Sequence, residues 1–148
     1  REAAQKRMPM LAECGGYMYL CSQVTSFEGR DYLMAGLIPE VCRMEKSLQT
    51  VGYVEATALA DNILCRAGES LRGHEFHFSR MEPVDSSDGK QSAFLMTKNR
   101  TGAQYWAGFA DQNLVASYLH IHFAGNLPAA RRFVDHCAAF RISGDGAL

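Results

Sequence analysis

The sequence predicts a mixed α/β domain whose central sheet is mostly parallel and carries an antiparallel portion. Three observations support this fold class. An apolar run, a small turn and a helix-like segment follow one another at 8–20, as in the strand-turn-helix unit of a parallel sheet. From residue 52 onward come five β-prone runs separated by glycines and polar clusters, which favours antiparallel pairing. The segment 126–140 then shows apolar residues at helical spacing.

Length and composition limit the classes of function. The chain has 148 residues, enough for one domain with a core but not for two. It is 47% hydrophobic and 21% charged, which is typical of a globular protein. A net charge of −1 gives no basic excess, so we expect neither nucleic acid nor an anionic membrane as a partner. Small molecules or other proteins remain as the expected partners.

Targeting and cysteine patterns agree with a cytoplasmic protein. No apolar run approaches the roughly 18 residues that span a bilayer, and residues 1–7 are charged and lack a signal-peptide core. The cysteines have no CxxC spacing, which favours free thiols in a reducing compartment over structural zinc or a disulfide framework. They are Cys14, Cys21, Cys42, Cys65 and Cys137.

The expected elements can be given in chain order. The first half predicts a helix at 1–7 that packs on the sheet, a core strand at 8–12, a short helix at 17–24, a polar connection at 27–34, a loop or short extended piece at 35–39 and helical spacing over 41–48. The second half predicts strands at 52–59, 69–81, 92–98, 105–110 and 114–123, a turn at 85–89, a helix at 126–140 capped by Asn126, and a frayed tail at 143–148.

Cys14 is the first candidate for chemistry. It stands between a short apolar strand and a helix, where a sharp turn would present its side chain outward. Gly15 and Gly16 would take the strained dihedrals of that turn, and the helix start would aim free N–H groups at the thiol. Such groups favour a thiolate and can hold an oxyanion. A buried structural cysteine in an ordinary turn is the alternative, and a nearby base would decide between them.

His120 supplies the candidate base. The β-prone run 116–123 places His120 and His122 on one face if the strand continues through both. A histidine at the end of a core strand could take the proton of a thiol and later donate it to a leaving amine. A metal site would need a third ligand, and His74 and His77 lie three residues apart, hence on opposite faces of a strand. For His136, on the last helix, we favour a structural role.

A third cluster lies at 71–79. Arginine, histidine, glutamate, histidine and serine alternate there with apolar and aromatic residues. They could position an anionic or amide substrate or contact a partner domain, or the segment could be an edge strand with a solvated face. Both interpretations stay open at this point.

Three blocks at 12–20, 72–79 and 116–123, in this order, resemble the C-terminal glutamine amidotransferase domain of the cobyrinate (or hydrogenobyrinate) a,c-diamide synthases. Gly36 to Pro39, Met44 and Gly52–Tyr53 fit the same pattern, and the resemblance runs from residue 8 to about 140. It implies a class I glutamine amidotransferase fold, a flavodoxin-like three-layer sandwich with a mixed sheet. Residues 1–148 would form its C-terminal part.

The resemblance also implies roles for residues. Cys14 would attack the carboxamide of glutamine, and His120 would protonate the departing ammonia and then activate water. The Gly15 N–H would be one oxyanion donor, worth about 3 kcal/mol in comparable sites. Many class I glutaminases have a glutamate two residues after the histidine; His122 stands there, so a Cys/His dyad is expected. Orientation or substrate positioning is left open for Glu13, His74, Glu75, His77 and His122.

Other parts of the family pattern are missing from the sequence. No GxxxxGK[ST] loop occurs, so ATP, Mg²⁺ and the corrinoid would bind a synthetase domain outside this chain, which itself needs no cofactor or metal. The first strands of the glutaminase domain, with a second oxyanion donor, are also absent. Because the first residue is Arg, we expect a fragment of a larger protein; a homodimer is left open.

Three alternatives remain from the sequence. The acceptor could be another tetrapyrrole, as in a nickel-sirohydrochlorin diamide synthase. The chain could instead be an inactive, truncated interaction module that binds a synthetase partner. A metal-binding protein that uses the clustered histidines is the third.

Overall fold

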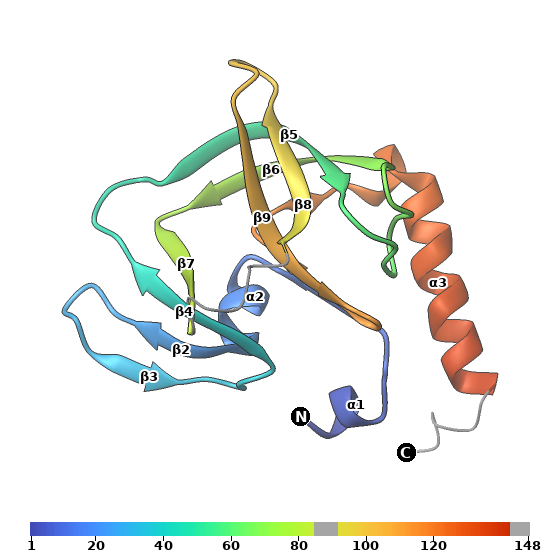
Figure 1. Cartoon of the computed structure of the whole chain (residues 1–148), viewed down its shortest axis with the longest axis horizontal. Helices are drawn as coiled ribbons and strands as arrows, with labels where there is room; N and C mark the ends of the chain where they lie inside the picture. The colour runs from blue at the N-terminus through green and yellow to red at the C-terminus, as the bar shows by residue number, and fades with distance from the viewer. Residues whose placement is uncertain (85–91, 143–148) are drawn as a thin grey trace.

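Two β-sheets organise the part of the chain that the computed structural model describes, residues 1–84 and 92–142 (Figure 1). The predicted turn at 85–89 and the predicted tail at 143–148 lie outside these residues. The larger sheet has seven strands in the order β1-β10-β9-β8-β5-β6-β11. Their bounds are β1 Met10–Glu13, β5 Thr50–Ala58, β6 Ser70–His77, β8 Ser92–Lys98, β9 Gln104–Asp111, β10 Leu114–Ser117 and β11 His120–Ile121.

The smaller sheet has four strands in the order β3-β2-β4-β7. They are β2 Cys21–Thr25, β3 Asp31–Leu33, β4 Ile38–Met44 and β7 Ser79–Pro83. The helical elements are α1 Glu2–Gln5, α2 Gly15–Leu20, the 3₁₀ turn η1 Phe123–Gly125 and α3 Leu127–Ile142. In Figure 1, α2 lies between the two sheets and α3 runs along the opposite side of the molecule.

The mixed α/β fold is confirmed, but the expected proportion of parallel strands is wrong. Within residues 1–84 and 92–142, the parallel pairs are β1 with β10 in the larger sheet and β2 with β4 in the smaller one. The remaining pairs of both sheets are antiparallel. Parallel neighbours need a crossover of a dozen or more residues, whereas β8, β9 and β10 follow one another through short turns.

Several predicted elements change type or split. Residues 41–48 show helical spacing, yet 38–44 form strand β4, because Ile38, Glu40 and Cys42 are buried at the period of two that a strand requires. The helix expected at 17–24 ends at Leu20, and β2 begins at once. The run 69–81 splits into β6 and β7, which belong to different sheets, and 114–123 splits into β10, β11 and a turn. The first helix is short, and none of its residues is buried.

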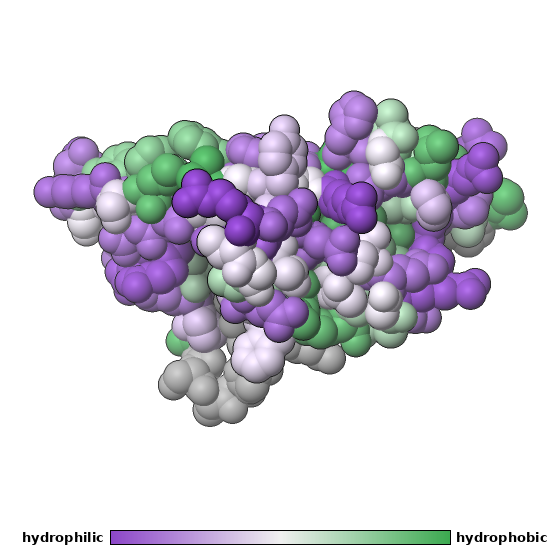
Figure 2. Space-filling view, turned by 90° about the horizontal axis from the view of Figure 1, so that it is seen from above, coloured by the Kyte–Doolittle hydropathy of each residue, from purple (hydrophilic) through white to green (hydrophobic). Residues whose placement is uncertain are grey.

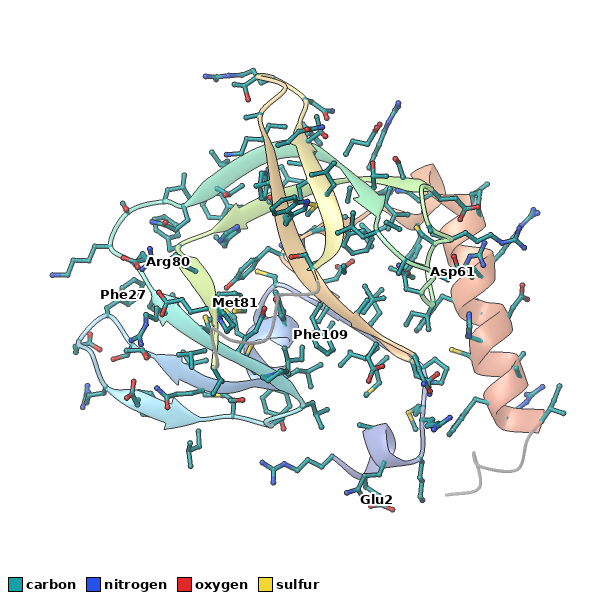
Figure 3. The ribbon with its side chains drawn as sticks, in the orientation of Figure 1. Glu2, Phe27, Asp61, Arg80, Met81 and Phe109 are labelled. Carbon is teal, nitrogen blue, oxygen red and sulfur yellow. The ribbon has the colours of Figure 1, made fainter. Side chains whose placement is uncertain are left out.

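The apolar residues form two cores. The first contains Val54, Ala56, Phe94, Met96, Val115 and Leu119 and is extended by Ala129 and Phe133 of α3. The second lies around α2 and contains Tyr17, Cys21, Ile38, Ala116 and Tyr118; Met81 and Phe109, labelled in Figure 3, pack against it. Tyr17 of α2 is buried in this second core, and Met18 and Leu20 of α2 pack against it. Burying one large apolar side chain contributes about 1.5–3 kcal/mol, so these contacts stabilise the position of α2.

The surface mixes polar and apolar residues. Figure 2 shows both kinds side by side over the upper face of the molecule. Large apolar side chains that remain exposed include Tyr53, Phe76 and Trp106 on the larger sheet. Among the described residues, no helix combines the length and the apolar character needed to cross a membrane.

Candidate functional site

Cys14 occupies a strained turn directly between β1 and α2. Its backbone has φ +50° and ψ −109°, a conformation that residues with a Cβ rarely adopt. The Cys14 N–H donates to the Ser117 carbonyl at 2.9 Å, and its own carbonyl accepts from Met18 N–H at 3.2 Å. Such a residue costs about 1–3 kcal/mol and persists only where the surrounding structure imposes it. A strained residue between strand and helix is the geometry of a nucleophile elbow.

The two glycines after Cys14 have a different role from the one predicted. Neither Gly15 nor Gly16 has a positive φ, so the strain falls on the cysteine itself and the expectation that the glycines carry it is wrong. A Cβ on Gly15 would meet no atom within 4 Å, whereas one on Gly16 would contact Ala12 at 3.5 Å. Gly15 therefore leaves open space beside the partly exposed thiol.

Glu13 joins the cysteine turn to the strand of His120. One carboxylate oxygen, Oε1, accepts a hydrogen bond from the backbone N–H of Ile121 at 3.0 Å. The other, Oε2, lies 3.9 Å from His120 Nδ1. Glu13 directly precedes Cys14, and Ile121 directly follows His120. The contact therefore connects the Cys14 turn to the strand of His120.

Gly73 allows β11 to approach β6 closely. In the antiparallel pair β6·β11, His120 stands opposite His74 and Ile121 opposite Gly73. A Cβ on Gly73 would lie 2.5 Å from the His120 carbonyl oxygen and 2.6 Å from Leu119 Cδ1, distances that real side chains do not show. The position of His120 therefore depends on a residue without a side chain in β6.

His74 is the third polar residue beside this pair. Tyr53 of β5, His74 of β6 and His120 of β11 are successive register partners, so they share one face of the larger sheet. The Tyr53 and His74 rings meet edge to face, with centroids 5.4 Å apart. The structure thus brings Glu13, His74 and His120 to one place.

Glu75 and His77 lie on the other face of β6, as the alternation of a strand requires. They line a cavity of about 230 Å³ between the two sheets, together with Tyr17, Ser79, Tyr105 and Tyr118. Cys14 and His120 do not line it. The predicted cluster 71–79 is therefore divided between two environments: His74 lies on the face of His120, whereas Glu75 and His77 line the cavity.

The cavity side chains are buried and hydrogen-bonded. Glu75 is 1% exposed and accepts from the Tyr105 hydroxyl. Burial raises the pKa of Glu75, while the Tyr105 hydrogen bond and the Lys98 charge act in the opposite direction. His77 stacks on Tyr118 with centroids 3.8 Å apart, and burial lowers its pKa. These residues form a polar cluster beside the second apolar core.

The strand does not continue through His122, so the condition under which His120 and His122 would share a face is not met. Strand β11 ends at Ile121, and His122 is the first residue of the turn into η1. Its carbonyl accepts from Gly125 N–H at 2.9 Å and from Asn126 Nδ2 at 3.0 Å, and the residue is exposed. The alternation of strand faces therefore ends at Ile121.

Sequence reasoning missed the tertiary contacts of two polar residues, Asn126 and Tyr118. Asn126 was predicted to cap the last helix, but its side chain accepts from Arg72 N–H and donates to the Arg72 carbonyl, both at 3.0 Å. Tyr118 lies 2.5 Å from Ser79 Oγ and 3.6 Å from Cys42 Sγ, which joins the two sheets. Asparagine just before a helix was a visible signal, but its partner in a distant strand was not.

The histidines do not gather into a metal site in the part of the chain that the structure describes. Among residues 1–84 and 92–142, no group of three or more histidine, cysteine, aspartate or glutamate side chains is arranged to hold a metal ion. The chemistry available at the site is that of a thiol, an imidazole and a carboxylate.

Comparison with known proteins identifies the class. Residues 1–128 match the CobB/CobQ-like glutamine amidotransferase domain, and the chain belongs to this family. At the level of individual relatives, the chain is 37% identical over 140 residues to a cobyrinate a,c-diamide synthase of Caldanaerobacter subterraneus, covering 95% of this chain and 30% of the relative. It is 40% identical to one of Dehalococcoides mccartyi, covering 90% and 28%, and 36% identical to one of Priestia megaterium, covering 94% and 29%. The chain therefore spans less than a third of the length of these relatives.

Proposed function

We propose that the protein carrying this chain hydrolyses glutamine and supplies the ammonia for amidation of the a and c carboxylates of a cobyrinic (or hydrogenobyrinic) acid. The strained turn at Cys14 carries the proposal, because it places a partly exposed thiol between a strand and a helix, with open space at the adjacent Gly15. The names of the relatives support the acceptor. ATP, Mg²⁺ and the corrinoid would bind sequence outside this chain.

The proposed chemistry uses two side chains in two steps. The Cys14 thiolate attacks the carboxamide carbon of glutamine, and His120, which has taken the thiol proton, protonates the leaving nitrogen as the C–N bond breaks. Ammonia departs and leaves a γ-glutamyl thioester. His120 then takes a proton from water, whose oxygen attacks the thioester carbon and releases glutamate and the thiol. The Gly15 N–H would stabilise the oxyanion in both steps, and His74 would help to position glutamine.

Substitution of Cys14 tests the proposal in the complete protein as its gene encodes it. Cys14→Ala should lower the rate of amidation with glutamine as the nitrogen donor by about 10³-fold or more. Amidation of the same corrinoid with free ammonia should continue. Cys137→Ala is the matched control, since Cys137 is also a partly exposed free thiol but lies on α3.

Covalent labelling gives a second measurement. A glutamine-analogue electrophile should modify Cys14, detected by mass spectrometry of peptides, and glutamine in excess should protect it. A Cys14→Ala protein that hydrolyses glutamine at the wild-type rate would refute the proposal. An intact protein that takes no adduct and shows no glutaminase activity would favour the inactive interaction module.

A further inference from the structure

We propose that Glu13 is a positioning residue for His120 and fills the place that His122 leaves without a carboxylate. This inference rests on the proposed glutaminase function. In a thiol–imidazole pair, a third group usually fixes the tautomer and the orientation of the ring. Glu13 lies at ion-pair distance from the His120 ring and is held by the neighbouring backbone N–H of Ile121, and it comes from β1 rather than from the strand of the histidine.

The two oxygens of Glu13 have separate partners. Oε1 accepts from Ile121 N–H at 3.0 Å, so the carboxylate cannot turn freely. With Oε1 held, Oε2 faces His120 Nδ1 at 3.9 Å. The Glu13 side chain is 30% exposed and that of His120 47%, so the pair is partly shielded from water. A negative charge near Nδ1 favours the proton on that nitrogen and leaves Nε2 free to take the thiol proton.

The other residues near His120 are less suited to this role. His122 lies in the turn into η1 and carries no charge complementary to an imidazolium. His74, the register partner of His120, has its ring against Tyr53. Glu75 is on the opposite face of β6 and is bonded to Tyr105. Glu13 is thus the carboxylate whose contacts reach both the His120 ring and its neighbouring backbone.

The amide of glutamine at position 13 separates the two contacts. In Glu13→Gln, the oxygen can still accept from Ile121 N–H, but the NH₂ group then faces Nδ1 and favours the opposite tautomer, with the proton on Nε2. If the amide flips, Ile121 N–H loses its acceptor. The glutamine oxygen can therefore accept a hydrogen bond from Ile121 N–H or face a protonated Nδ1 of His120, but it cannot do both.

Steady-state kinetics of glutamine hydrolysis test the inference in the complete protein. Glu13→Gln should lower kcat by about 10- to 100-fold with a small change in KM, because a wrong tautomer impairs the proton transfers more than substrate binding. Glu13→Asp, which keeps the charge, should recover part of the loss. Glu55→Gln is the matched control: Glu55 is a partly exposed carboxylate whose ion pair is with Arg72, not with a histidine.

Nitrogen NMR of ¹⁵N-histidine-labelled protein gives a readout that a purely structural role would not change. The His120 signals, assigned by their loss in His120→Gln, should show Nδ1–H in the wild type and a shift toward Nε2–H in Glu13→Gln. A Glu13→Gln protein with the wild-type kcat and an unchanged His120 tautomer would overturn the role of Glu13 and leave the proposed glutaminase function in place. A wild-type protein without glutaminase activity and without adduct on Cys14 would overturn the proposed function and this role together.

Discussion

At the scale of single residues, backbone strain and a buried charge-bearing group occur at two different residues, Cys14 and Glu75. Cys14 carries an unfavourable backbone conformation at a partly exposed turn, whereas Glu75 carries a carboxylate in the interior. In the proposed chemistry, this turn holds the thiol between β1 and α2, beside the second apolar core. Glu75 contacts no substrate in the proposed mechanism, and its carboxylate accepts a hydrogen bond from Tyr105.

The pH dependence of stability should reveal Glu75. Its pKa is raised in the folded protein, first by burial, so its contribution to stability is fully present below its ordinary pKa and is lost as the pH rises through the folded value. Glu75→Gln cannot lose a proton and keeps an oxygen for the Tyr105 hydroxyl. The unfolding free energy of Glu75→Gln minus that of the wild type should therefore increase from about pH 4.5 upward, by about 1.4 kcal/mol for each unit by which the pKa of Glu75 is raised.

Urea denaturation at a series of pH values between 4 and 8 measures this difference. Glu55→Gln serves as the control, since its side chain is partly exposed and its ion pair with Arg72 is at the surface. A Glu75→Gln protein whose stability relative to the wild type falls as the pH rises would contradict the assignment.

At the scale of elements, the closest contact in the site is that between β6 and β11. Gly73→Ala should displace β11, because the new Cβ would overlap the His120 carbonyl and Leu119. We expect a loss of about 1–3 kcal/mol in unfolding free energy. Because His120 moves with its strand, we also expect a lower kcat for glutamine hydrolysis under conditions in which the variant is still folded. Denaturation and steady-state kinetics of one protein sample measure both.

Gly68→Ala provides a comparison for this prediction. Gly68 has φ +82° and open space around it, so alanine there introduces backbone strain without a steric clash at β11. It should cost stability and leave kcat unchanged. Equal losses of kcat in the two variants would show that the position of His120 does not depend on Gly73.

The elements also show where sequence patterns were sufficient. Residues 92–98 form the strand that was predicted, and the strand-turn-helix order around Cys14 was correct, because short apolar runs with glycine-rich ends allow few alternatives. Helical spacing was wrongly predicted over 41–48, where strand β4 ends at Met44. One of the buried positions of β4 is a glutamate, Glu40, whose burial is possible because Tyr17 donates a hydrogen bond to it. A buried polar residue with a distant partner cannot be recognised from local spacing.

The candidate site was predictable only as far as local sequence patterns reach. Cys14 and His120 have types and local contexts that indicate chemistry, and His74 was correctly placed on the opposite face from His77. That Glu13 contacts the strand of His120 depends on a separation of 108 residues, which no local pattern encodes. The division of 71–79 between a surface and a cavity likewise follows from how the two sheets pack.

At the scale of the whole molecule, Tyr118 connects the two sheets. It lies between β10 and β11 of the larger sheet, and its hydroxyl is 2.5 Å from Ser79 Oγ of β7 in the smaller one. Tyr118→Phe should cost about 1–3 kcal/mol, because it leaves the buried Ser79 hydroxyl without this partner. Urea denaturation of Tyr118→Phe, Ser79→Ala and the double variant measures the coupling. Additive losses would show that the two hydroxyls are energetically independent.

The contact between Glu13 and Ile121 has a consequence for the shape of the larger sheet. β1 and β11 are its two terminal strands, and this side chain joins them where no backbone ladder does. A single side-chain hydrogen bond therefore connects one edge strand of the sheet to the other, next to the turn of Cys14 and the strand of His120. Loss of this one contact would leave every backbone ladder of the sheet in place, so a substitution of Glu13 should change the local arrangement of these two segments without unfolding the sheet.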